Sequence, residues 1–200
     1  THRGEGPPVK ERGAAMLSEA EKAELLKRAR HAAAQALGLP EGRRDLPPPE
    51  GRLAEPGAAF VTWKKDGRLR GCIGSVEPWR PLAEDVEKNA VAALLRDPRF
   101  APAQPRDLPR LSIDVSVMTP LEEVTDPLAQ LEIGVHGVVV RKGQRSGLLL
   151  PQVAPEWGWD VATLLEQVCL KAGLPGDAWR AGNPPASLYR FSAEVFGESA

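Results

Sequence analysis

The sequence contains few of the residues that build disulfide frameworks or metal sites. It has two cysteines and three histidines in 200 residues, and Cys72 and Cys169 do not form a CxxC pair. This excludes a disulfide framework and a structural zinc site, and we expect neither a metal nor a cofactor. Unpaired cysteines are typical of a reducing compartment, so we expect the protein in the cytoplasm.

Long apolar runs and an excess of one charge are missing as well. No stretch approaches the roughly 20 apolar residues that span a bilayer, and no signal peptide is recognisable, so we expect no membrane association. The 26 basic residues nearly balance the 27 acidic ones, which gives no global argument for binding nucleic acid. Walker, GxGxxG and HExxH motifs do not occur.

One stretch, Arg68–Ser75 (Arg-Leu-Arg-Gly-Cys-Ile-Gly-Ser), is the centre of the sequence argument. It follows a run of β-favouring residues, and the Asp66-Gly67 pair between the two is a strong hairpin signal. A two-residue turn there predicts that Trp63 lies opposite Arg70. The guanidinium would then cover the indole ring, which is a structural task that needs no ligand.

The same register places Cys72 opposite Val61, between two glycines. Gly71 and Gly74 weaken a strand unless a bulge, or the close approach of another backbone or a ligand, requires them. A thiol in this position is either a small core residue, as free cysteine usually is, or an accessible group that reacts with or contacts a ligand. The candidate ligand- or partner-binding residues beside Cys72 are Arg70, Gly71, Ile73, Gly74 and Trp79.

His136 is the second candidate for catalysis. It lies in Gly134-Val135-His136-Gly137 at a predicted strand entry, where an imidazole can act as the base for a thiol such as Cys72. The alternative is that His136 caps a tight, glycine-rich turn. Basic residues of the first hairpin, together with Trp63 and Trp79, leave a further alternative open, namely binding of single-stranded nucleic acid.

Local signals predict the other elements. A capping box at Ser18 begins a helix over about 18–37, and Asp160 begins a later helix that carries Cys169 beside its apolar stripe. A helix between them enters at Pro81 and ends before Asp97-Pro98. We expect 151–155 to be a plain connection, and the remaining predicted strands are 111–117, 137–141, 146–150 and a single last strand, 188–196.

The order strand, strand, helix, strand occurs twice. Gly71 aligns with Gly147, and the closing strands of the two halves align without a gap. Cys72 then falls on Leu148 and Arg70 on Ser146, so that the second half lacks the thiol and the guanidinium.

The predicted fold is therefore α+β. Duplicated strand-strand-helix-strand units form a mostly antiparallel or mixed curved sheet, with helices outside and two lobes. The predicted organisation is a flexible segment over 1–15 and one domain over 16–200, with repeats at about 58–118 and 134–197.

Several strings occur in the order found in one known family. They are Phe60-Val61-Thr62, Leu69–Gly74, Asp97–Phe100, Val115–Val117, Gly134–Gly137, Leu149–Val153, Gly158–Asp160 and Tyr189–Phe191. On these residues the chain resembles the AMMECR-one domain family, named for the Alport syndrome, midface hypoplasia, intellectual disability and elliptocytosis chromosomal region. The resemblance covers roughly 15–197 and implies a two-lobed α+β domain in a prokaryotic member, without a known reaction.

The resemblance also implies partners, because prokaryotic relatives are similar to proteins that occur beside, or fused with, a MEMO-like protein and a radical S-adenosylmethionine enzyme. We therefore expect first a binding, adaptor or carrier module that acts with these two proteins. The alternatives are a Cys72-dependent enzyme on a small-molecule or protein substrate, and a binder of RNA or single-stranded nucleic acid. Whether the chain is an enzyme stays open at this point.

Overall fold

The computed structural model describes residues 17–198, so the flexible segment predicted over 1–15 lies outside the described residues. The α-helices are α1 (Glu19–Ala36), α2 (Leu82–Leu95), α3 (Pro127–Gln130), α4 (Val153–Trp157) and α5 (Val161–Lys171). The strands are β1 (Pro56–Gly57), β2 (Ala59–Lys65), β3 (Arg68–Gly74), β4 (Arg80–Pro81), β5 (Leu111–Met118), β6 (Glu122–Val124), β7 (Gly137–Lys142), β8 (Arg145–Leu149), β9 (Ser187–Phe191) and β10 (Ala193–Gly197).

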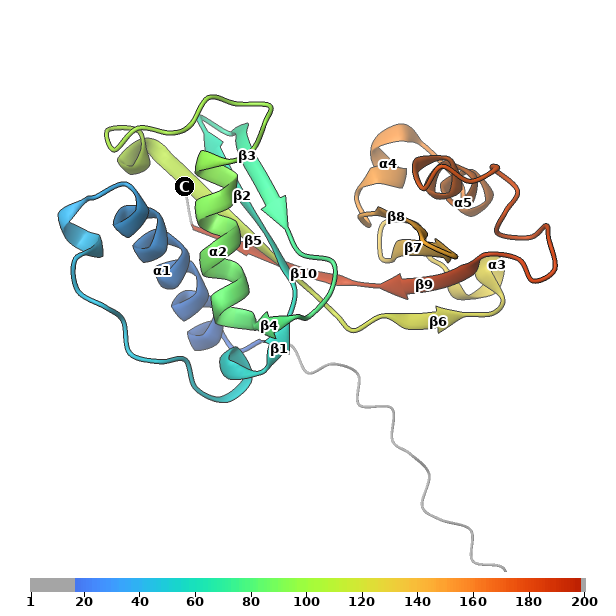
Figure 1. The fold of residues 1–200 in the computed structure, drawn as a ribbon, viewed down its shortest axis with the longest axis horizontal. Helices are drawn as coiled ribbons and strands as arrows, with labels where there is room; N and C mark the ends of the chain where they lie inside the picture. The colour runs from blue at the N-terminus through green and yellow to red at the C-terminus, as the bar shows by residue number, and fades with distance from the viewer. Residues whose placement is uncertain (1–16, 199–200) are drawn as a thin grey trace, which may run out of the picture.

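Two four-stranded sheets form the frame of the molecule (Figure 1). The N-terminal sheet has the order β10-β5-β2-β3, and the C-terminal sheet has the order β6-β9-β7-β8. Strands β1 and β4 form a separate short pair, and every pairing is antiparallel. The predicted α+β class is confirmed, with sheets that are antiparallel throughout.

The two sheets exchange their outer strands. Strand β6 follows β5 along the chain but pairs with β9, whereas β10 follows β9 and pairs with β5. The chain therefore crosses between the sheets twice, and Thr119 and Ser192 join the two crossings. The Thr119 N–H donates to the Ser192 carbonyl, and the Ser192 N–H donates to Thr119 Oγ1, both at 2.8 Å.

Local signals explain where the elements begin. Ser18 and Glu21 form the predicted capping box of α1, and Asp160 accepts the Thr163 N–H at the start of α5. The turn of the first hairpin has positive φ at both Asp66 and Gly67, as a type I′ turn requires.

Each sheet buries one face against helices. Helices α1 and α2 cover the N-terminal sheet over a core that includes Val61, Trp63 and Ile113, and α5 covers the C-terminal sheet (Figure 1). On their other faces the sheets share a small apolar cluster, in which Met118 meets Phe191. Cys169 of α5 is fully buried in the core of the C-terminal half, as predicted.

Two predicted elements were wrong. The single last strand is two strands, because the chain changes sheets at Ser192. The predicted connection 151–155 contains the start of α4, and Gly158 in the left-handed region caps the end of this helix. The short helix forms although Pro155 lies inside it, because a proline in the first turn of a helix has no N–H bond to lose.

Candidate functional site around Cys72

A β-bulge between Trp63 and Lys64 shifts the register of the first hairpin, so the predicted register was wrong. Trp63 lies opposite Gly71, and Thr62 lies opposite Cys72. Arg70 is the extra residue of the bulged strand. A bulge redirects side chains, and here it separates the guanidinium from the indole that it was predicted to cover.

Arg70 instead contacts the segment that follows α2. Its guanidinium carbon lies 5.7 Å from the centre of the Phe100 ring, and Nη2 donates to the Ala101 carbonyl at 2.7 Å. Trp63 is completely buried, and its indole N–H donates to the Ala90 carbonyl at 2.9 Å. The cation over Trp63 is Arg30, at 5.6 Å.

The two glycines beside Cys72 permit close packing. A Cβ on Gly71 would lie 1.9 Å from the Ala93 carbonyl oxygen in α2, and a Cβ on Gly74 would lie 2.2 Å from the Phe60 ring. The helix therefore passes directly over the strand at Gly71. Because both close approaches are made by the protein itself, neither glycine requires a ligand.

Cys72 is half-buried on the edge strand β3. Its sulfur accepts a hydrogen bond from the Thr62 hydroxyl at 3.1 Å. Its backbone N–H points away from β2 and donates to Asp97 Oδ2 at 3.0 Å. Hydrogen bonds thus hold both the side chain and the backbone of Cys72 in place.

Asp97 is the residue that sequence reasoning missed. Its buried carboxylate accepts the Cys72 N–H and binds Arg99 through Nε at 3.0 Å and Nη2 at 2.8 Å. The hydrogen bonds from Arg99, and then the one from the Cys72 backbone, hold the pKa of Asp97 far below its ordinary value. Asp97-Pro98 was interpreted only as a helix stop, although Asp97–Phe100 was one of the strings that resembled the family.

Arg99 brings positive charge toward the thiol. The pKa of Arg99 is raised, first by its hydrogen bond to Asp97 and also by the charges of Asp97 and Cys72. Its guanidinium carbon lies 5.5 Å from the Phe100 ring centre, so Arg70 and Arg99 both contact this ring. A cation near a partly exposed thiol is the environment in which cysteines become reactive.

His136 lies directly before β7, beside the C-terminal sheet. Its ring Nδ1 accepts the Glu132 backbone N–H at 3.0 Å, and its backbone N–H donates to the Glu132 carbonyl at 3.0 Å. These two bonds close the turn before β7. Burial, and secondarily the charge of Arg190, lower the pKa of His136. Within residues 17–198, the hydrogen bond at the Cys72 sulfur comes from Thr62 and not from His136.

Trp79 lies in the loop between β3 and β4, with 82 % of its surface exposed. The next residue, Arg80, donates to Asp85 at 2.8 Å, and the Ser75 hydroxyl donates to the same carboxylate at 2.6 Å. Asp85 is buried in α2, so both ends of this loop are attached to the helix while Trp79 faces solvent. Ile73 is half-buried against the N-terminal core.

A crevice of about 720 Å³ opens beside this loop. Val76, Glu77 and Pro78 line one side, the chain crossing at Thr119–Leu121 lines another, and Arg141 of β7 reaches in from the C-terminal sheet. Arg141 binds Glu77 at 2.6 Å and lies over the Tyr189 ring at 5.2 Å. The ion pair thus joins the Trp79 loop to the C-terminal sheet.

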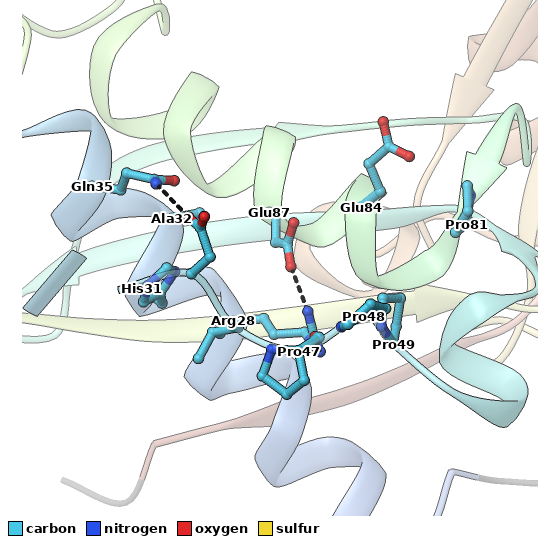
Figure 2. Close-up of a pocket in the computed structure, with 12 residues that line it drawn as sticks. Arg28, His31, Ala32, Gln35, Pro47, Pro48, Pro49, Pro81, Glu84 and Glu87 are labelled. Atoms are coloured by element: carbon cyan, nitrogen blue, oxygen red, sulfur yellow. Dashed lines mark hydrogen bonds and ion pairs between the residues drawn. The ribbon is translucent and has the colours of Figure 1, made fainter. Parts of the chain in front are cut away.

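A second pocket, of about 420 Å³, lies between α1 and the proline-rich segment 45–49 (Figure 2). Arg28 lies at its base, buried, and binds Glu87 at 3.0 Å and the Pro47 carbonyl. The cation therefore attaches the proline segment to both helices. This pocket has no lining residue in common with the Cys72 region.

In residues 17–198, no three His, Cys, Asp or Glu side chains are grouped so that they could hold a metal ion. None of the helices in this range has both the length and the apolar character to cross a membrane.

Comparison with known proteins identifies close relatives in archaea. The family model for AMMECR1 matches residues 26–196. Protein MK0488 of Methanopyrus kandleri is 49 % identical over 159 residues, which are 76 % of each chain. A protein of Aeropyrum pernix is 40 % identical over 205 residues, covering 98 % of this chain and 86 % of the relative.

A solved structure is similar as well. The crystal structure of the uncharacterized protein PH0010 from Pyrococcus horikoshii matches with a TM-score of 0.74 and 37 % identity. The match covers 88 % of this chain and 90 % of that one. The similarity thus extends over most of the fold described above.

Proposed function

Because the chain belongs to the AMMECR1 family, we propose that it is a binding or adaptor module that acts with a radical S-adenosylmethionine enzyme and a MEMO-like protein. The partners are those that the sequence resemblance implies. The observation that carries the proposal is Trp79, which is 82 % exposed on a loop attached to α2 at both ends. A large aromatic side chain held in solvent is typical of the centre of a protein interface.

The crevice beside the Trp79 loop supports the proposal that this surface binds a partner. Its volume of about 720 Å³ falls within the range of ordinary binding pockets. Val76, which is 36 % exposed, and Pro78 line the crevice and belong to the same loop as Trp79. A partner side chain could enter the crevice while its backbone packs on the indole.

The experiment is a pull-down of the radical enzyme and the MEMO-like protein from the same genome, followed by affinity measurement for Trp79→Ala. A hot-spot tryptophan contributes about 2 kcal/mol, so we expect affinity to fall about thirtyfold. Trp157→Ala is the matched control, because Trp157 is 70 % exposed but lies on α4. Absence of a complex with either protein would overturn the proposal.

A Cys72-dependent enzyme is the second candidate. Arg99 near a half-buried sulfur that accepts a hydrogen bond from Thr62 favours it. We expect iodoacetamide to alkylate Cys72 faster than a free cysteine, with buried Cys169 as the unreactive internal reference. Protection of Cys72 in the folded protein at every pH would remove this candidate. The role of His136 as its base also stays a proposal.

We further infer that the two halves are copies of one ancestral unit, arranged as two lobes. The shared strand order and the equivalent positions of Gly71 and Gly147 under their helices support this. We also propose that the protein is cytoplasmic, and the two free thiols support this proposal.

A further inference from the structure

Positive charge is concentrated at one end of the N-terminal sheet. The tip of the first hairpin (64–70) and the segment after α2 (96–110) meet there, and we call them together the cationic end (Figure 1). The whole chain has a formal net charge of −1, so this excess is local. The cations are Lys64, Lys65, Arg68, Arg70, Arg96, Arg99, Arg106 and Arg110, and the acids are Asp66, Asp97 and Asp107.

Specific contacts hold the two segments together. Arg70 crosses from the hairpin to the Ala101 carbonyl, and both Arg70 and Arg99 contact the Phe100 ring. The pKa of Asp107 is lowered, first by the Gln104 N–H that it accepts and also by the positive charges around it, which include Lys65 and Arg70. Charges of the hairpin tip therefore interact with charges of the segment after α2.

Only part of this charge is neutralised by the protein. Lys64 pairs with Asp114, and Arg99 pairs with Asp97. In contrast, Arg68, Arg96 and Arg106 are exposed, and none of the ion pairs of residues 17–198 involves them. Cations that form no ion pair, gathered in two adjoining segments, attract and orient an anionic partner.

The neighbouring apolar residues indicate the kind of anion. A binding surface for single-stranded nucleic acid needs exposed aromatic rings on which bases stack. Here Trp63 is buried and Phe100 is half-buried beneath two guanidinium groups. Leu69 on β3 is a large apolar side chain of the cationic end and is 44 % accessible. An aliphatic group between arginines fits a polypeptide better than a nucleic acid.

We propose that the cationic end binds an acidic protein segment, whose carboxylates pair with Arg68, Arg96 and Arg106 and whose apolar side chain covers Leu69. Arginine forms bidentate pairs with carboxylates, so such a segment is held in a defined orientation. The inference rests on the proposed adaptor function and gives it a second contact surface, separate from Trp79.

The probe is a fluorescein-labelled peptide of glutamates around one leucine, titrated with the full chain at low salt. Reversing three charges in R68E/R96E/R106E is expected to weaken binding by more than about tenfold, and Leu69→Ser by about threefold. The matched control, K27E/R43E/R44E, changes the charge by the same amount on exposed residues near α1 and is expected to bind within about twofold of wild type. Wild-type affinity falls as salt rises.

Three outcomes would overturn the inference: no peptide binding at low salt, an equal loss in the control variant, or tighter binding of a single-stranded oligonucleotide of equal charge. The last outcome would assign the surface to nucleic acid. Failure of the adaptor proposal is distinguishable, because it gives peptide binding without any complex with the radical enzyme or the MEMO-like protein. If R68E/R96E/R106E binds the radical enzyme or the MEMO-like protein as tightly as the wild type, the cationic end is not part of that interface, and the adaptor proposal stands without it.

Discussion

The N-terminal and C-terminal sheets connect their strands in the same order, but different kinds of side chain are buried beside them. In each, a hairpin (β2–β3 or β7–β8) lies under a helix, and a later strand (β5 or β9) pairs with the first strand of the hairpin. The buried polar or charged side chains of residues 17–198 all belong to the N-terminal half, and they are Arg28, Asp85, Asn89 and Asp97. The buried core of the C-terminal half is apolar.

The edge strands show the difference at single positions. The outward N–H of Cys72 donates to the buried Asp97 carboxylate, whereas the outward carbonyl of Leu148 accepts from Lys171 at the surface. The bulge that redirects Arg70 is absent from the register of β7 and β8. Similar hairpins therefore carry Arg70 and Cys72 in β3 and Ser146 and Leu148 at the aligned positions of β8.

The largest expected effect comes from the glycines under the helices. Gly71→Ala places a Cβ 1.9 Å from the Ala93 carbonyl oxygen, whereas Gly147→Ala places one 2.9 Å from the Val168 carbonyl oxygen. We expect the free energy of unfolding to fall by about 3 kcal/mol for Gly71→Ala and by about 1 kcal/mol for Gly147→Ala. Urea unfolding measures both, and equal losses would contradict the tighter packing of α2.

The second largest loss of stability is expected from removal of the buried Asp97 carboxylate. Asp97→Ala leaves the Cys72 N–H without its acceptor, so we expect a loss of about 2 kcal/mol in the free energy of unfolding. Lys171→Met, which removes the exposed counterpart in the C-terminal sheet, is expected to cost less than about 0.5 kcal/mol.

The pH dependence tests the same carboxylate. Because the pKa of Asp97 is lowered in the folded state, its contribution is complete above its ordinary pKa of 3.8 and is lost as the pH falls below that value. Acid unfolding of Asp97→Asn should therefore show less dependence on pH below about 4 than that of the wild type. Parallel acid curves for the two proteins would show that the carboxylate is not stabilised in this way.

The bulged arginine has a smaller effect. Arg70→Ala removes the bond to the Ala101 carbonyl and the contact with Phe100, and we expect about 1 kcal/mol of destabilisation by urea unfolding. Ser146→Ala, at the exposed position in the second hairpin that the sequence alignment pairs with Arg70, should change stability by less than about 0.5 kcal/mol. A neutral Arg70→Ala would mean that the bulge is not held by its side chain.

The smallest effect concerns His136. Its pKa is lowered in the folded state, so the protein loses stability as the pH falls below the ordinary histidine value of 6.5, where the unfolded chain takes up the proton first. We expect the amide of Glu132 to exchange faster at pH 5 than at pH 7, after correction for intrinsic exchange, because protonated Nδ1 cannot accept its hydrogen bond. His136→Ala is expected to remove this pH dependence. Unchanged alkylation of Cys72 in the same variant would count against His136 as the base of the thiol.

Sequence reasoning worked where the cause is local. The capping residues Ser18 and Asp160 begin helices because their side chains bind N–H groups three residues away, and the Asp66-Gly67 turn follows from positive φ. It failed at the hairpin register, where one bulged residue places Arg70 beside Phe100 and not beside Trp63. The spacing of hydrophobic residues in the sequence does not reveal such a bulge. Cys72 could be selected as a candidate, but its partner Asp97 lies 25 residues away.

The sequence by itself determined the α+β class, the positions of the main helices and the family resemblance, because these follow from periodicity, caps and matched strings. Only the tertiary structure decided which residues surround Cys72, that His136 closes the turn before β7, and that β6 and β10 are exchanged between the sheets. The reason is physical: a strand edge can pair with several partners, and the choice depends on packing between segments far apart in the chain.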